Sequence, residues 1–152
     1  MLKQKIAPAE AESIKKAFDK CKNVVICTHT SPDGDAIGSS LGLWLYLKSL
    51  GKNPTVIVPN YFPDFLHWME GADKIIQYDR NRTLSKAIIS SADLVCCLDF
   101  NALDRIEDLA TPLRYSKAKK VMIDHHLNPE KFCDITISRP DSSSTCELLF
   151  RV

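Results

Sequence analysis

The sequence lacks a large net charge, a long apolar run and any internal repeat. Its 20 lysines and arginines nearly balance 19 aspartates and glutamates, for a formal charge of +1. With this balance, the net charge does not attract nucleic acids or anionic membranes strongly, so an anionic partner must be recognised by local groups. No stretch approaches the roughly 18–20 apolar residues of a membrane span, and the polar N-terminus does not read as a secretory signal. We therefore expect no membrane association.

The sequence also lacks any Cys-x-x-Cys pair among its six cysteines. Cys27, Cys96 and Cys97 fall in apolar runs that are typical of buried strands. Buried, reduced thiols of this kind are common inside cells, where disulfides are rare. We therefore predict a cytoplasmic protein with free thiols rather than a disulfide framework.

The apolar pattern predicts alternating strands and helices. With 152 residues and 45% hydrophobic residues, the chain suits one domain with a sizeable core. The predicted strands are 24–28, 55–58, 74–78, 94–98, 120–123 and an edge strand at 133–137. The predicted helices are 8–21, 36–50, 82–91 and 143–152, with a helical or turn-rich segment at 102–117 that Pro112 breaks and a short turn at 64–69. Such alternation indicates an α/β fold, namely a Rossmann-like, doubly wound, mainly parallel sheet with helices on both faces.

Potential metal ligands come directly after three of these predicted strands. The stretch VVICTHTSPDGDAIGSSLG at 24–42 places three of them in one turn, and the two later strands end in Asp99 and in Asp-His-His. The carboxyl ends of parallel strands lie along one edge of the sheet, where ligands bind. We therefore expect these side chains to meet. They are His29, Asp33, Asp35, Asp99, Asp124, His125 and His126.

Carboxylates gathered at one edge repel one another. Two unit charges about 4 Å apart cost about 4 kcal/mol at an effective dielectric constant near 20. These loops contain no lysine or arginine, so divalent cations are the natural counter-charge, and the carboxylate-imidazole set favours manganese, iron or zinc over calcium. Two ions roughly 3.5–4 Å apart can hold a phosphoryl oxygen and generate a hydroxide nucleophile near neutral pH.

Each motif also has an ordinary interpretation. Pro-Asp-Gly is common turn chemistry, Asp99 could cap a helix near Ala102, and the Asp-His-His triplet could be a polar strand end. Three such coincidences at three strand ends are improbable, so a metal centre is favoured. Two rivals stay open: Asp33 as a covalent nucleophile in the manner of Asp-x-Asp phosphatases, and a non-catalytic nucleotide-binding module.

The three motifs together resemble motifs I to III of the DHH phosphoesterases. The motifs are His29-Thr-Ser-Pro-Asp-Gly-Asp-Ala-Ile-Gly-Ser39, the strand-terminal Asp99, and Asp124-His-His126. The whole sequence is most similar to the branch of bifunctional oligoribonucleases and 3′-phosphoadenosine 5′-phosphate (PAP) phosphatases, and residues 142–149 resemble the helix that follows in that branch.

The resemblance implies two divalent ions, usually manganese. One ion would be held by His29, Asp33 and Asp99. The second would be held by Asp35, Asp99 and His125, with Asp99 bridging the two ions.

The resemblance also implies roles around these ligands. His126 would lie close to the scissile phosphate, and Asp124 would orient a ligand histidine, as metal-bound imidazoles usually require. Asn101, Arg105 and Ser39 would contact substrate. The substrates would be short RNA or DNA oligonucleotides, cut from an end, or nucleoside bisphosphates such as PAP. Cleavage of cyclic dinucleotides or pyrophosphate is the alternative within the family, and a homodimer is a further expectation.

The sequence departs from the family pattern near its C-terminus. The fourth motif, which supplies another metal-binding aspartate, and the C-terminal substrate-binding (DHHA1-type) domain have no counterpart in residues 1–152. The last predicted helix also stops without a cap at Val152. We therefore expect residues 1–152 to be the N-terminal part of a DHH phosphoesterase, binding metal weakly and turning over slowly by itself.

Overall fold

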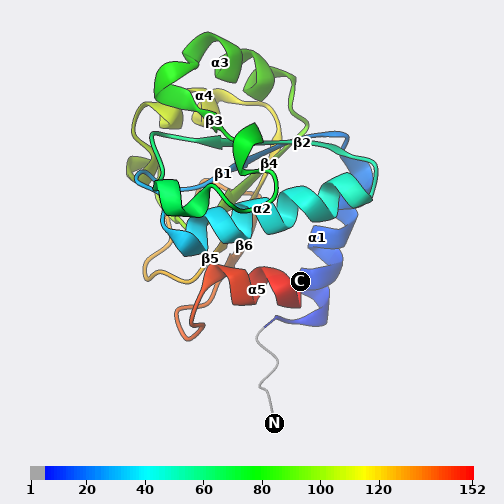
Figure 1. Cartoon of the computed structure of the whole chain (residues 1–152). Helices are drawn as coiled ribbons and strands as arrows, with labels where there is room; N and C mark the ends of the chain where they lie inside the picture. The colour runs from blue at the N-terminus through cyan, green and yellow to red at the C-terminus, as the bar shows by residue number, and fades with distance from the viewer. Residues whose placement is uncertain (1–5) are drawn as a thin grey trace.

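Six parallel strands form one sheet in the computed structural model, which describes residues 6–152 (Figure 1). Their spatial order is β3-β2-β1-β4-β5-β6, the strand order of a Rossmann sheet. All five strand pairs are parallel, so the α/β, doubly wound prediction is confirmed. The strands are β1 (Asn23–Cys27), β2 (Asn53–Val58), β3 (Ile76–Gln77), β4 (Leu94–Leu98), β5 (Lys119–Asp124) and β6 (Ile135–Ser138).

The helices cover the two faces of the sheet separately (Figure 1). On one face lie α1 (Pro8–Lys20), α2 (Gly34–Ser49) and α5 (Thr145–Arg151). On the other lie α3 (Arg82–Ser91), α4 (Ala110–Tyr115) and the 3₁₀ segment η4 (Leu103–Leu109). Shorter 3₁₀ turns are η1 (Asp64–Leu66), η2 (Ala72–Lys74) and η3 (Tyr78–Arg80). Within residues 6–152, no helix is both long and apolar enough to span a bilayer.

The central strand β4 shows why these strands are apolar without alternation. Leu94, Cys96 and Leu98 pack with α1 and α2, whereas Val95 and Cys97 pack with α3 and α4. Because helices cover both faces, all five residues are buried. The predicted burial of these cysteines is confirmed, since Cys96 and Cys97 are 1% and 0% exposed.

Helix α2 begins and ends at residues that suit those positions. Asp33 is the N-cap, and its carboxylate accepts the amide of Ala36 at 3.0 Å, so the helix starts two residues before the predicted position. Gly51 follows the helix with φ +75°, a left-handed conformation that glycine adopts without steric cost.

Some local predictions are wrong. Pro112 does not break the 102–117 segment, because it lies in the first turn of α4, where its missing N–H needs no partner. The break falls instead at Glu107, which has φ +51°. The last helix begins two residues after its predicted start at 143, because Ser144 is its N-cap and the Ser144 Oγ accepts the amide of Glu147. The predicted strand 74–78 shortens to β3 between two 3₁₀ turns. The turn predicted at 64–69 is confirmed, because η1 and the turn residues that follow it cover 64–68.

Candidate metal centre

The three ligand-bearing loops lie beside one another because β1, β4 and β5 are neighbours in the sheet. Cys27 is in register with Cys97, and Leu98 is in register with Ile123, so the three strands end at the same edge. The loop after β1 carries His29, the loop after β4 begins with Asp99, and β5 ends at Asp124, directly before His125 and His126. The predicted convergence of distant segments is therefore present in the structure.

Asp99 lies at the centre of the cluster. Its side chain is 2% exposed; Oδ2 is 3.3 Å from Nε2 of His29, and Oδ1 is 3.3 Å from Nε2 of His125. Its backbone has φ +63°, a left-handed conformation that aspartate adopts more readily than most residues, and its amide donates to the carbonyl of Ile123. Each oxygen of one carboxylate thus faces a different imidazole, which divides the centre into two halves.

The His29 half consists of His29 and Asp33, which lie on one loop. Nε2 of His29 is 3.7 Å from Oδ1 of Asp33, and its Nδ1 donates to the Thr30 carbonyl at 2.7 Å. Because a carbonyl can only accept, Nδ1 carries the proton and Nε2 faces the carboxylates. Burial lowers the pKa of His29, but its bonds with Asp99 and Thr30 outweigh this effect and hold the pKa above 6.5. The side chain of Asp33 is 65% exposed.

The His125 half consists of His125 and Asp35, and α5 braces it. Nε2 of His125 is 3.5 Å from Oδ2 of Asp35. The two oxygens of Asp35 accept the backbone amides of Thr145 and Cys146, both at 2.9 Å. Burial raises the pKa of Asp35, but these hydrogen bonds outweigh it, and the pKa lies below its ordinary value. Thr145 is fully buried, and its hydroxyl donates to Oδ1 of Asp99 at 3.0 Å.

His126 and Asp124 form a hydrogen-bonded pair beside this half. Asp124 is fully buried and accepts both the amide of His126 and its Nδ1, the latter at 2.7 Å. The rings of His125 and His126 have centroids 4.5 Å apart. Asp124 therefore orients His126, which is not one of the two predicted ligand histidines, and Nε2 of that ring points away from the bonded carboxylate. A catalytic role for either residue stays a prediction.

The donor set fits divalent cations. Ligand atoms of His29, Asp33 and Asp99 lie within 4.8 Å of one another, as do those of Asp99, His125 and His126. Nitrogen and oxygen donors at about 2.0–2.2 Å from one ion are separated by about 3.0–3.5 Å, close to the 3.3–3.7 Å measured here. Among the described residues, the ion-pair partners of Asp33, Asp35 and Asp99 are histidines, so no fixed cation offsets these carboxylates.

The three predicted substrate contacts lie at different places around the cluster. Nδ2 of Asn101 donates to the Leu127 carbonyl at 2.8 Å, which joins the loops after β4 and β5. Arg105 is exposed, and its carbonyl accepts the amide of Thr30 at 2.8 Å. Ser39 is 1% exposed, and its hydroxyl donates to the Ala36 carbonyl within α2. Asn101 and Arg105 thus border the candidate metal centre, whereas Ser39 lies within α2. Substrate contact by these three residues stays a prediction.

The sequence reasoning missed the residues that hold the cluster from α5. The bonds of Thr145 to Asp99 and of Thr145 and Cys146 to Asp35 span 46 and about 110 residues. The run Ser142-Ser-Ser-Thr145 carried a signal, because such residues favour helix N-termini. Only the packing of α5 against α2 brings that N-terminus to Asp35.

A comparison with known families decides the family. Residues 23–152 match the family described as "DHH family, N-terminal domain". The chain belongs to the DHH family. The family resemblance inferred from the sequence is therefore confirmed.

Curated relatives are similar over most of this chain. The bifunctional oligoribonuclease and PAP phosphatase NrnA of Thermus thermophilus is 29% identical over 130 residues, covering 83% of this chain and 35% of the relative. The protein of the same name from Bacillus subtilis is 27% identical over 132 residues, covering 85% of this chain and 37% of the relative. The chain thus spans little more than a third of the length of these relatives.

Solved structures share the fold. An exopolyphosphatase-related protein from Bacteroides fragilis superposes with a TM-score of 0.94 and 53% identity, covering 96% of this chain and 43% of that one. RecJ of Thermus thermophilus, solved in complex with Mn²⁺, superposes with a TM-score of 0.53 and 15% identity, covering 94% of this chain and 19% of RecJ. The RecJ likeness concerns the fold alone.

Proposed function

We propose that this chain is the metal-binding part of a phosphoesterase that hydrolyses short RNA or DNA oligonucleotides from an end, or PAP, or both. The observation that carries the proposal is the position of Asp99, whose two oxygens face His29 and His125 separately. A carboxylate so placed suits two neighbouring ions. The family and the names of the curated relatives agree with phosphoester hydrolysis.

In this proposal the side chains hold two divalent ions, with manganese as the preferred metal. His29, Asp33 and Asp99 hold one, and Asp35, Asp99 and His125 hold the other. Ions held in this way polarise phosphoryl oxygens and make water nucleophilic near neutral pH. Asp124 holds the ring of His126 through Nδ1. In this proposal His126 would lie beside the scissile phosphate, where its Nε2 could donate a hydrogen bond or move a proton.

The rest of the substrate site is part of the same proposal. Asn101, Arg105 and Ser39 contact substrate, and a C-terminal DHHA1-type domain completes the site in a longer protein that acts in the cytoplasm as a homodimer. The small share of the curated relatives that this chain covers supports this view. Residues 1–152 are then expected to turn over more slowly than a longer protein.

A second candidate is hydrolysis of phosphoanhydrides, which uses the same ions. Its support is the 53% identity to a structure named as exopolyphosphatase-related. The two candidates differ in whether the ligand carries a base.

The deciding experiment compares three substrates with and without manganese. Product release from pApA, from PAP and from tripolyphosphate is measured for the chain and for a longer natural version of it, with EDTA as the metal-free control. We expect manganese-dependent release from pApA or PAP to exceed that from tripolyphosphate. Release from tripolyphosphate alone would favour the second candidate, and no manganese-dependent release from any substrate would contradict both.

A further inference from the structure

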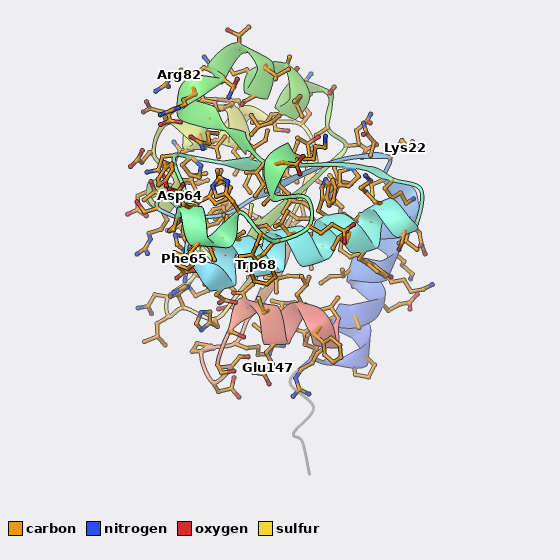
Figure 2. The ribbon with its side chains drawn as sticks, viewed as in Figure 1. Lys22, Asp64, Phe65, Trp68, Arg82 and Glu147 are labelled. Carbon is orange, nitrogen blue, oxygen red and sulfur yellow. The ribbon has the colours of Figure 1, made fainter. Side chains whose placement is uncertain are left out.

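Three exposed aromatic side chains gather on the segment that follows β2. Tyr61, Phe65 and Trp68 are 50%, 72% and 80% exposed, and they lie within eight consecutive residues. Figure 2 labels Phe65 on the η1 turn and Trp68 just after it, in front of α2. Exposed apolar side chains that cluster on one segment, unlike singly scattered ones, indicate a binding surface. We call these three residues the aromatic platform.

The platform is held firmly from below. Phe62 and Leu66 are 2% and 4% exposed and belong to the core cluster that includes α2. The Phe62 ring stacks on His67 with centroids 4.3 Å apart and an interplanar angle of 14°. The Tyr61 hydroxyl donates to Oδ1 of Asp64 at 2.5 Å, which fixes the position of that ring. A platform anchored in this way loses little conformational freedom on binding.

Asn60, which directly precedes Tyr61 of the platform, is hydrogen-bonded to the loop that carries His29. Oδ1 of Asn60 accepts the amide of Ser31 at 2.7 Å and the hydroxyl of Thr30 at 3.3 Å. The Thr30 carbonyl accepts Nδ1 of His29, so one chain of bonds runs from the imidazole to the residue before Tyr61. The platform therefore continues the edge at which the candidate ligands lie.

The charge of the segment that carries the platform indicates which part of a ligand could bind there. Residues 59–70 contain Asp64 and Glu70 but no lysine or arginine, so the segment repels phosphate groups. Aromatic faces stack on nucleobases whatever the base, because every base has a π-face. From this geometry, and on the basis of the proposed function, we infer that the platform binds a nucleobase of the substrate whose phosphate lies at the metal centre.

The test compares a ligand that carries a base with one that lacks it. Binding of AMP and of ribose 5-phosphate to the manganese-loaded chain is measured by calorimetry, for the wild type and for Phe65→Ala and Trp68→Ala. We expect AMP to bind more tightly than ribose 5-phosphate. Each substitution is expected to weaken AMP binding by about 5- to 100-fold, the range for loss of one stacked base, and to leave ribose 5-phosphate unchanged.

Tyr115→Ala is the matched control, because Tyr115 is 78% exposed but ends α4 on the opposite face of the sheet. It should leave both ligands unchanged. As a second readout, AMP should quench wild-type tryptophan fluorescence, and this quenching should be lost in Trp68→Phe.

Other outcomes overturn the inference in distinguishable ways. If the wild type binds both ligands equally, or if AMP binding is unchanged in both variants, the platform does not bind the nucleobase. The proposed function would still stand in either case. If the substitutions change only self-association in sedimentation experiments, the aromatic side chains cover a second copy of the chain instead. If the manganese-loaded wild type binds neither ligand, the proposed function fails together with the inference.

Discussion

The two halves of the metal centre share Asp99 but are held in different ways. In the His29 half, His29 and Asp33 are four residues apart on one turn, and the Asp33 side chain is 65% exposed. In the His125 half, the Asp35 side chain is 21% exposed, and both of its oxygens accept amides from the start of α5. One half is therefore made by local chain geometry, and the other depends on packing between distant helices.

This difference has an energetic consequence. Ligands fixed before a cation arrives lose little freedom on binding, whereas an exposed carboxylate must first be ordered. The amides on Asp35 also favour its charged form, which is the form that binds a cation. We therefore expect the two halves to bind ions with distinguishable affinities and to respond differently to substitution.

The largest effect is expected from Asp99→Asn, which changes both halves at once. Asparagine tolerates the left-handed backbone at this position, so the fold should be retained. The substitution removes the charge that faces His29 and His125, and each of two manganese-binding events should weaken by more than about 100-fold. Calorimetric titration with MnCl₂ measures the number of events.

The matched control for this experiment is Asp73→Asn, because that side chain is 77% exposed and pairs with the adjacent Lys74. It should bind manganese as the wild type does. Loss of one event in Asp99→Asn, or of neither, would mean that Asp99 does not bridge the halves.

A smaller effect, confined to one half, is expected from Thr145→Val. This change keeps the shape of a fully buried side chain but deletes the hydroxyl that bonds Oδ1 of Asp99, the oxygen facing His125. Loss of such a supporting bond typically weakens metal binding by about 10- to 100-fold. One manganese event should weaken within this range, and the other should change little.

Thr145→Ser retains the hydroxyl and should restore most of the lost affinity. If valine and serine weaken manganese binding equally, the role of Thr145 is packing rather than orientation of Asp99. If both events weaken equally, the two halves are not separable.

The contrast between the halves also explains what the sequence could predict. Buried parallel strands gave continuous apolar runs such as Leu94–Leu98, and the ligands of the His29 half lie close together in one motif, so both were visible in the sequence. The bracing of Asp35 by Thr145 and Cys146 was not, because it depends on the packing of α5 against α2. The break at Glu107 was misplaced at Pro112 for a local reason, since proline is disruptive only beyond the first turn.

The smallest effect is expected from the ion pair between Glu10 and Arg139, which lies outside the candidate metal centre. Glu10 on α1 pairs with Arg139, which directly follows β6 and precedes α5 in the chain. The hydrogen bond from Arg139, helped by the amide of Ala7, holds the pKa of Glu10 below its ordinary value of 4.5. A lowered carboxyl pKa contributes stability above the unfolded-state pKa, and this contribution is lost as the pH falls through the folded-state pKa.

Glu10→Gln should therefore lower the free energy of unfolding at pH 7 by about 1 kcal/mol or less, as for a partly exposed ion pair. Urea unfolding of both proteins measures this difference, which should narrow as the pH falls below 4.5 and vanish once wild-type Glu10 is protonated. Both manganese events should be unchanged at pH 7, because Glu10 touches neither half. A difference that persists at low pH would assign the effect to packing of α1, and a weakened His125 half would mean that the brace on Asp35 extends through Arg139 to α1.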